Sequence, residues 1–194
     1  STFAEPLYTK WISDFQKAEK DIQFNYQGVG SGAGIKQLLE GTVDFAGSDD
    51  PIKATDEAKV KAGVLHLPIA AGAVVVSYNL AEVTKTLRLS GPVIAKIFNG
   101  KITKWSDAEI KALNPGITIP DKTIAVATRS DGSGTTAVFS EYLSKVSPDW
   151  SGKNGKTVNW FPGSLGAKGN AGVAGLIKQN PGTIGYVELV YAVE

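Results

Sequence analysis

The sequence predicts an α/β protein built on a largely parallel sheet. Short apolar segments of strand length alternate with amphipathic segments of helix length, a pattern typical of sheets covered by helices. Loops rich in Gly, Ser, Thr and Asp follow several of the expected strands, and in such folds these loops gather at one edge of the sheet. With 42% apolar and 20% charged residues among 194, the chain can bury a normal core and form one large domain or two small ones.

The first 40 residues are expected to form helix, strand and helix in turn. Apolar residues recurring at three- and four-residue steps predict a helix over 4–20, and alternating apolar and polar residues predict a strand over 22–26. The glycine-rich stretch 28–34 then leads into a helical pattern at 35–40.

The next segments continue the alternation. A short apolar strand is expected over 43–46, followed at 48–51 by residues that favour a turn and a helix start. Residues 55–62 look helical, and the apolar runs 64–69 and 73–78 are expected to be buried strands.

A second α/β set is expected after residue 80. Helical patterns lie near 90–99 and 106–113, and a Pro-rich connection follows at 115–120. A strand over 123–127 then runs into the polar loop 129–135.

The remaining elements follow that loop. A helix is expected to contain Phe139 and Leu143, and residues 147–163, rich in Gly, Pro, Ser, Asn and Trp, predict a long surface loop. A helix over 168–179 and a strand over 183–187 complete the set.

Charge and composition exclude several classes of function. The 20 basic residues balance 19 acidic ones too evenly for a nucleic-acid-binding surface, so no nucleic acid is expected as a partner. No apolar run approaches the roughly 18 residues of a membrane-spanning helix. The absence of cysteine excludes disulfides and thiolate metal sites. Because the sequence begins at Ser1 and contains no methionine, we expect that an N-terminal segment such as a secretory signal precedes it in the precursor.

Three polar loops, at 28–34, 47–51 and 129–135, are each expected to follow a strand and to start a helix. A helix N-terminus has unpaired N–H groups and a partial positive charge, so it can hold an oxyanion. Glycine lets an anion approach the backbone closely, and Ser or Thr adds a hydroxyl donor. Three such loops that converge would form an anion cage.

The alternative is that Ser31, Ser48 and Ser133 only cap their helices. The third loop favours an anion site, because Arg129 stands just ahead of Ser133 and can offer two parallel hydrogen bonds to one tetrahedral anion. Asp131 is expected to orient Arg129 and to temper its charge.

A carboxylate at Asp49 should repel a fully ionised ligand. Inorganic phosphate near neutral pH keeps a hydroxyl that can donate to a carboxylate, whereas sulfate has none. Asp49 would therefore select phosphate over sulfate. The competing interpretation of Asp49 is a helix cap.

Several segments resemble, in order and spacing, those of the periplasmic phosphate-binding proteins that feed ABC phosphate transporters. They are Thr2-Phe3, 26–34, 43–49, 100–105, 114–116, 129–135 and 182–188, so the likeness covers the whole chain. The resemblance implies a two-lobed flytrap fold, with mixed, mostly parallel sheets flanked by helices, and phosphate in the cleft between the lobes. We expect lobe one over 1–79 and lobe two over 80–194.

The resemblance also implies the ligand contacts, a partner and a location. By matching position, the phosphate contacts are Thr2, Phe3 through its backbone, Ser31, Asp49, Arg129, Ser133, Gly134 and Thr135, with Asp131 as the partner of Arg129. The protein would be periplasmic or otherwise extracytoplasmic and would deliver phosphate to an ABC transporter permease, with membrane attachment through a segment outside this sequence left open. Arsenate, which has the shape and protons of phosphate, is a possible second ligand.

The chain departs from the family pattern at both ends. It lacks the small Gly/Ala-rich turn that precedes the segment matching Thr2-Phe3, and family members continue past the position of Glu194 into the rest of lobe two and back into lobe one. We therefore expect that the C-terminal portion is supplied by a second chain, or that the sequence is a fragment or a reduced relative.

Other classes of function remain as alternatives. Residues 28–33 fit the loose dinucleotide pattern G-x-G-x-x-A, with Asp49 about 20 residues on, which would indicate a nucleotide-binding oxidoreductase domain. A phosphate-sensing or assembly module could share the flytrap fold without a role in transport. With His66 as the single histidine and no cysteine, the sequence predicts no catalytic residue, no metal site and no cofactor.

Overall fold

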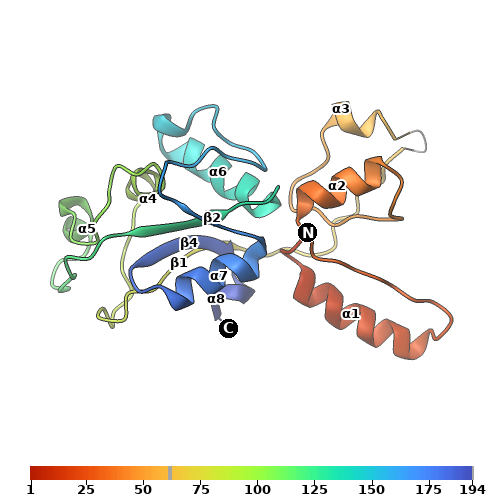
Figure 1. Cartoon of the computed structure of the whole chain (residues 1–194), viewed down its shortest axis with the longest axis horizontal. Helices are drawn as coiled ribbons and strands as arrows, with labels where there is room; N and C mark the ends of the chain where they lie inside the picture. The colour runs from red at the N-terminus through yellow and green to blue at the C-terminus, as the bar shows by residue number, and fades with distance from the viewer. Residues whose placement is uncertain (61–62, 194) are drawn as a thin grey trace.

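The computed structural model describes residues 1–60 and 63–193. Figure 1 shows two parts: a sheet with helices on both of its faces, and the helices α1, α2 and α3 to one side of it. These three helices are Glu5–Ala18, Ser31–Leu39 and Ala54–Glu57. The N-terminus lies between the two parts. None of the helices in the described residues is long and apolar enough to cross a membrane.

The described residues form a four-stranded sheet in the order β1-β4-β2-β3. Its strands are β1 (Val74–Tyr78), β2 (Ala125–Arg129), β3 (Leu165–Ala167) and β4 (Thr183–Glu188). β1 runs antiparallel to β4, whereas β2 runs parallel to both β4 and β3. The sheet is therefore mixed and mostly parallel, as the sequence predicts.

Helices cover both faces of this sheet (Figure 1). They are α4 (Gly91–Phe98), α5 (Ala108–Leu113), α6 (Gly134–Val146), α7 (Gly169–Gln179) and α8 (Val190–Val193), with a 3₁₀ turn at Pro148–Trp150. β4 is buried along its whole length, and its side chains alternate between two clusters. Ile184 and Tyr186 belong to the larger cluster with α4 and α6, and Val187 belongs to the smaller one with α7. The ring of Tyr186 stacks on Phe139 at 4.4 Å between ring centroids.

Both helices predicted for the first 40 residues are present, although α2 begins at Ser31 and not at residue 35 as predicted. Three predicted strands are wrong. The segments 22–26, 43–46 and 64–69 carry no backbone ladder. A strand exists only where a neighbouring segment accepts and donates its backbone hydrogen bonds. No described segment forms such a ladder with these three, although the rings of Phe24 and Phe45 lie 6.0 Å apart. The helix predicted over 55–62 is limited in the described residues to α3, and residues 61–62 lie outside them.

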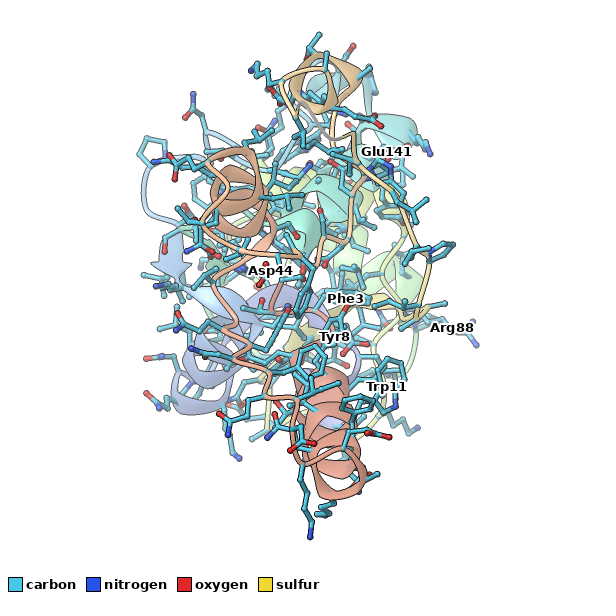
Figure 2. All side chains as sticks on the ribbon, turned by 90° about the vertical axis from the view of Figure 1, so that its right-hand side faces the viewer. Phe3, Tyr8, Trp11, Asp44, Arg88 and Glu141 are labelled. Carbon is cyan, nitrogen blue, oxygen red and sulfur yellow. The ribbon has the colours of Figure 1, made fainter. Side chains whose placement is uncertain are left out.

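Many apolar side chains of this first part are therefore exposed. Leu65 is 80% exposed and Leu67 is 68% exposed, although their segment was expected to be a buried strand. α1 has the predicted apolar stripe, yet none of its residues is buried and Trp11 is 45% exposed. Figure 2 looks onto this side and shows Tyr8 and Trp11 projecting from α1. The well-packed core lies on the two faces of the sheet.

The second half follows the predictions more closely. The helices expected near 90–99, 106–113 and 168–179 are α4, α5 and α7, and the strand over 183–187 is β4. β3 and α8 were not predicted. The division into lobes at residue 79 stays a prediction. β1, from the first range, pairs with β4, from the second, so one sheet takes strands from both ranges.

Candidate anion-binding site

The loop between β2 and α6 places a helix N-terminus at the edge of the sheet. β2 ends at Arg129 and α6 begins at Gly134. Ser133 caps α6, because its Oγ accepts the Thr136 N–H at 3.0 Å. Within the part of the chain that the structure describes, the N–H groups of Gly134 and Thr135 have no hydrogen-bond partner. This loop is therefore the strand-loop-helix element that the sequence predicts, with backbone donors left over.

Arg129 brings a buried cation to the same loop. Its side chain is only 1% exposed. Nε donates to Asp131 Oδ1 at 2.7 Å and Nη2 donates to Oδ2 at 2.6 Å, while Nη1 is buried without a partner among the described residues. The other arginine of the chain, Arg88, is exposed and projects from the rim in Figure 2. A buried guanidinium with one unpaired nitrogen can accept an anionic ligand without first giving up a hydrogen bond.

Asp131 is held ionised by its neighbours. Burial acts to raise its pKa, but the hydrogen bonds from Arg129 and from the Gly169 N–H outweigh burial, so the pKa lies below its ordinary value. Asp131 therefore neutralises part of the charge of Arg129 and fixes the orientation of the guanidinium.

The glycine-rich loop before α2 packs directly on the Arg129 loop. Gly32 N–H donates to the carbonyl of Gly132 at 2.9 Å. Gly30 has a φ of 87°, and a Cβ there would lie 2.6 Å from Asp131 Oδ2. Only glycine combines this backbone conformation with so close an approach. Ser31, the first residue of α2, is 1% exposed and is not the helix cap, since that position is taken by Gly30.

Asp49 lies between these two loops. Its N–H donates to Ser31 Oγ at 3.3 Å, and its carboxylate accepts the Thr135 hydroxyl at 3.2 Å and the Ser1 hydroxyl. The alternative interpretation of Asp49 as a helix cap is wrong, because α3 begins at Ala54 with Lys53 before it. A carboxylate that accepts from hydroxyl groups is suited to a ligand that carries a proton.

The remaining residue of the 47–51 loop that was singled out, Ser48, turns away from this cluster. Its hydroxyl donates to the Asp50 carbonyl at 2.5 Å, and the residue is exposed. Neither an expected strand nor a helix flanks this loop directly, so of the three predicted strand-loop-helix elements only the one at 129–135 is complete.

Thr2 and Phe3 reach the cluster from the N-terminus. The Thr2 hydroxyl accepts from the Asn170 N–H at 3.3 Å and from Asn170 Nδ2 at 3.1 Å. Asn170 Nδ2 also donates to Thr135 Oγ1 at 3.3 Å. The Phe3 N–H donates to Ser1 Oγ at 3.0 Å, and that hydroxyl in turn contacts Asp49.

The structure thus brings the predicted residues into one connected cluster. A chain of hydrogen bonds runs through Thr2, Asn170, Thr135, Asp49 and Ser31, and the glycine loop joins it to Arg129 and Asp131. Asn170 is completely buried and was not predicted, and neither was Ser1. No local motif marks Asn170, which is 168 residues from Thr2 in the sequence.

The structure has two cavities to compare with this cluster, one that borders it and one that lies apart from it. One, of about 500 Å³, is lined by Arg129 and Asp131 together with residues 157–160. The larger, of about 630 Å³, lies between β1 and α7, and none of the predicted site residues lines it. No buried unpaired donor lies among the lining residues of the larger cavity, so size alone is a poor guide here. The buried unpaired nitrogen of Arg129 marks the cluster around it as the candidate anion site.

The dinucleotide interpretation of residues 28–33 lacks its structural context. Such a fingerprint requires a strand directly before the glycines, and the structure has none in residues 22–27. The glycines instead pack against Gly132 and Asp131.

Comparisons with known proteins show the family to which the chain belongs. A family model described as a PBP superfamily domain matches residues 1–194. The phosphate-binding proteins PstS of Xylella fastidiosa strain Temecula1 and of Haemophilus influenzae are 47% and 46% identical over 100% and 99% of this chain. The chain spans only 53% and 57% of their lengths, about half of these curated relatives.

A solved structure from Clostridium perfringens is similar in fold. It is described as a putative phosphate ABC transporter substrate-binding protein with bound phosphate. The TM-score is 0.79 at 24% sequence identity, and the match covers 98% of this chain and 69% of that one.

Proposed function

The chain belongs to the PBP superfamily, and from that premise we propose that it binds inorganic phosphate between its three polar loops without changing it chemically. The observation that carries this proposal is the buried Arg129 Nη1, which has no partner among the described residues and lies in the loop that ends at the N-terminus of α6. The names of the relatives, phosphate-binding proteins, support the choice of anion.

We propose the following roles in binding. Arg129 is the single strong cation, and the N–H groups of Gly134 and Thr135 are the backbone donors. Thr2, the Phe3 backbone, Ser31 and the hydroxyls of Ser133 and Thr135 complete the contacts, and Asp131 supports Arg129. These groups would surround a tetrahedral oxyanion with hydrogen-bond donors.

Asp49 would provide the selectivity. A protonated phosphate oxygen can replace a hydroxyl such as that of Thr135 as a donor to the Asp49 carboxylate. Sulfate would instead place an acceptor against an acceptor, which costs binding free energy. Arsenate carries the same protons as phosphate and would be bound as well.

We propose that the bound phosphate is delivered to the permease of an ABC transporter on the extracytoplasmic side of the membrane. The description of the Clostridium perfringens protein as a putative phosphate ABC transporter substrate-binding protein supports this role. Uptake assays that combine the chain with a phosphate permease would test it. Stimulated uptake supports delivery, whereas phosphate binding without stimulation favours a sensing role.

A further polypeptide segment, supplied by a second chain or by continuation of this one, would cover the first part. Leu65, Leu67 and Ile69 are half or more exposed along an extended segment that offers free backbone groups. Contiguous exposed apolar residues of this kind are typical of a surface that another segment covers.

The direct test of the proposed function is isothermal titration of the 194-residue chain with phosphate, after unfolding and refolding to strip any bound anion. Sulfate at the same ionic strength is the control. Saturable binding of phosphate but not of sulfate supports the proposal. Absence of binding to a folded sample would contradict it.

A further inference from the structure

One ion pair joins the part that contains α1–α3 to the part that contains the sheet. Lys156 Nζ contacts Asp50 Oδ2, and their side chains are 19% and 39% exposed. Among the ion pairs formed by residues 1–60 and 63–193, it alone connects these two parts, since every other pair stays within one of them. Asp50 directly follows Asp49 in the sequence.

The backbone of Lys156 is itself fixed to α6. Its carbonyl accepts the N–H of Ser133, the cap of α6, at 2.9 Å. The preceding residue, Gly155, donates its N–H to Ser140 Oγ on α6 at 3.1 Å. The ammonium of Lys156 therefore reaches the loop that carries Asp49 from a backbone that is hydrogen-bonded to α6 and its cap.

We propose that Lys156 is a positioning residue for the phosphate site. Its ion pair with Asp50 holds the Asp49 loop against the N-terminus of α6 and slows the release of phosphate. The inference rests on the proposed function, and it adds a residue that lies outside the predicted contact set. The pair is shielded from solvent mainly on the side of Lys156, which is 19% exposed, so salt screens it less than a pair with two exposed partners and it can restrain two loops at physiological salt.

We call the Lys156–Asp50 ion pair the clamp. Two substitutions distinguish its proposed role from a simple effect of charge on the anion. If Lys156 acted only by attracting the anion, Lys156→Met would weaken binding but Asp50→Asn would strengthen it, because a negative charge near the anion is removed. The clamp predicts that both variants bind phosphate about tenfold more weakly, mainly through faster dissociation. It also predicts that the double variant is no weaker than either single one, because the same contact is lost once.

A conservative variant and a matched control complete the set. Lys156→Arg keeps the ion pair and should restore most of the affinity. Lys101 and Asp149 form an ion pair of 2.6 Å, 53% and 41% exposed, that involves no predicted site residue. Lys101→Met and Asp149→Asn should leave phosphate affinity and dissociation rate unchanged.

The clamp is also tested without phosphate. In the ligand-free chain, Lys156→Met and Asp50→Asn should each speed hydrogen exchange at the N–H groups of Asp49 and Ser133, and the control variants should not. Faster exchange in a chain that binds no phosphate would show that the ion pair restrains the two loops, but it would overturn both the proposed function and the role of Lys156 in retaining phosphate. Unchanged exchange and unchanged affinity in a chain that does bind phosphate would overturn the clamp and leave the proposed function standing. Tighter binding in Asp50→Asn would also overturn the clamp.

Discussion

Arg129 donates to both carboxylate oxygens of Asp131 and still has Nη1 buried without a partner in the residues that the structure describes. Two of the three guanidinium nitrogens are thus used to fix the side chain, and the third remains for a ligand. Because Asp131 also accepts the Gly169 N–H at 3.1 Å, the orientation of Arg129 is fixed from the start of α7 as well. The pair is therefore a preorganised half of an anion site.

Replacing Arg129 by alanine should abolish most phosphate binding. Loss of a buried charge-assisted contact costs roughly 3 kcal/mol, which corresponds to at least about a hundredfold in affinity. Arg129→Lys keeps the charge but loses the planar fork, so its affinity should be intermediate. Isothermal titration measures the effect, and Arg88→Ala is the control because Arg88 is exposed at the rim. An Arg129→Ala variant with unchanged affinity would refute the site.

Replacing Asp49 by asparagine should erode the discrimination against sulfate. The amide offers N–H donors where the carboxylate offered only acceptors, so a fully ionised oxyanion can approach. We expect sulfate affinity to rise and phosphate affinity to fall, measured as the ratio of the two dissociation constants. Asp44→Asn, at an exposed position labelled in Figure 2, should leave the ratio unchanged. Selectivity that survives in Asp49→Asn would rule out the proposed filter.

The Arg129–Asp131 ion pair also predicts that stability depends on pH. The pKa of Asp131 is lowered in the folded chain from its ordinary value of 3.8, because hydrogen bonds outweigh burial. The folded state therefore binds the proton less tightly than the unfolded state. The contribution of Asp131 to the free energy of unfolding is complete above about pH 4 and is lost as the pH falls through the lower folded value.

Urea unfolding from neutral pH down to about pH 2 should show this in the Asp131→Asn variant. The difference in the free energy of unfolding between the two proteins should be largest near neutral pH and should shrink below about pH 4. A difference that stays constant over the whole range would mean that the ionisation of Asp131 does not matter.

A substitution at Gly134 tests how closely the loops with Ser31 and Asp49 approach the start of α6. A Cβ at this position would lie 2.5 Å from Ser31 Oγ and 2.7 Å from Asp49 Cβ, so Gly134→Ala should push the loops apart and weaken phosphate binding by about tenfold or more. Gly175→Ala, in α7, is the matched control, because nothing lies within 4 Å of its Cβ. It should leave binding unchanged and raise the free energy of unfolding by up to about 1 kcal/mol. Equal affinities for the two variants would contradict the packing described for Gly134.

Elements with local signals could be predicted from the sequence. Ser133 followed by Gly134 and a helical pattern marks the start of α6, and the apolar run around Ile184 marks β4 because that strand is buried on both faces. The loop with Arg129 was found for the same reason, since its donors and its helix are adjacent in the sequence.

Features that depend on distant partners could not be predicted. The apolar run with Leu65 and Leu67 is typical of a strand, but a strand also needs a neighbour, and the sequence does not say whether one is present. β3 has only three residues, Leu165–Ala167, and begins just after the stretch 147–163 whose composition predicts a loop. Asn170 and Lys156 contribute through contacts that span 35 to 168 residues of sequence, so nothing local distinguishes them.

In the proposed complex, phosphate binds at the N-terminus of α6, between the loops that carry Ser31, Asp49 and Arg129. Backbone amide NMR spectra of the isotope-labelled chain, recorded during a phosphate titration, test binding and location together. The largest shifts should occur at the N–H groups of Gly134, Thr135 and Ser31, while those of α5 stay in place. Shifts centred elsewhere, or no shifts in a folded sample, would contradict it.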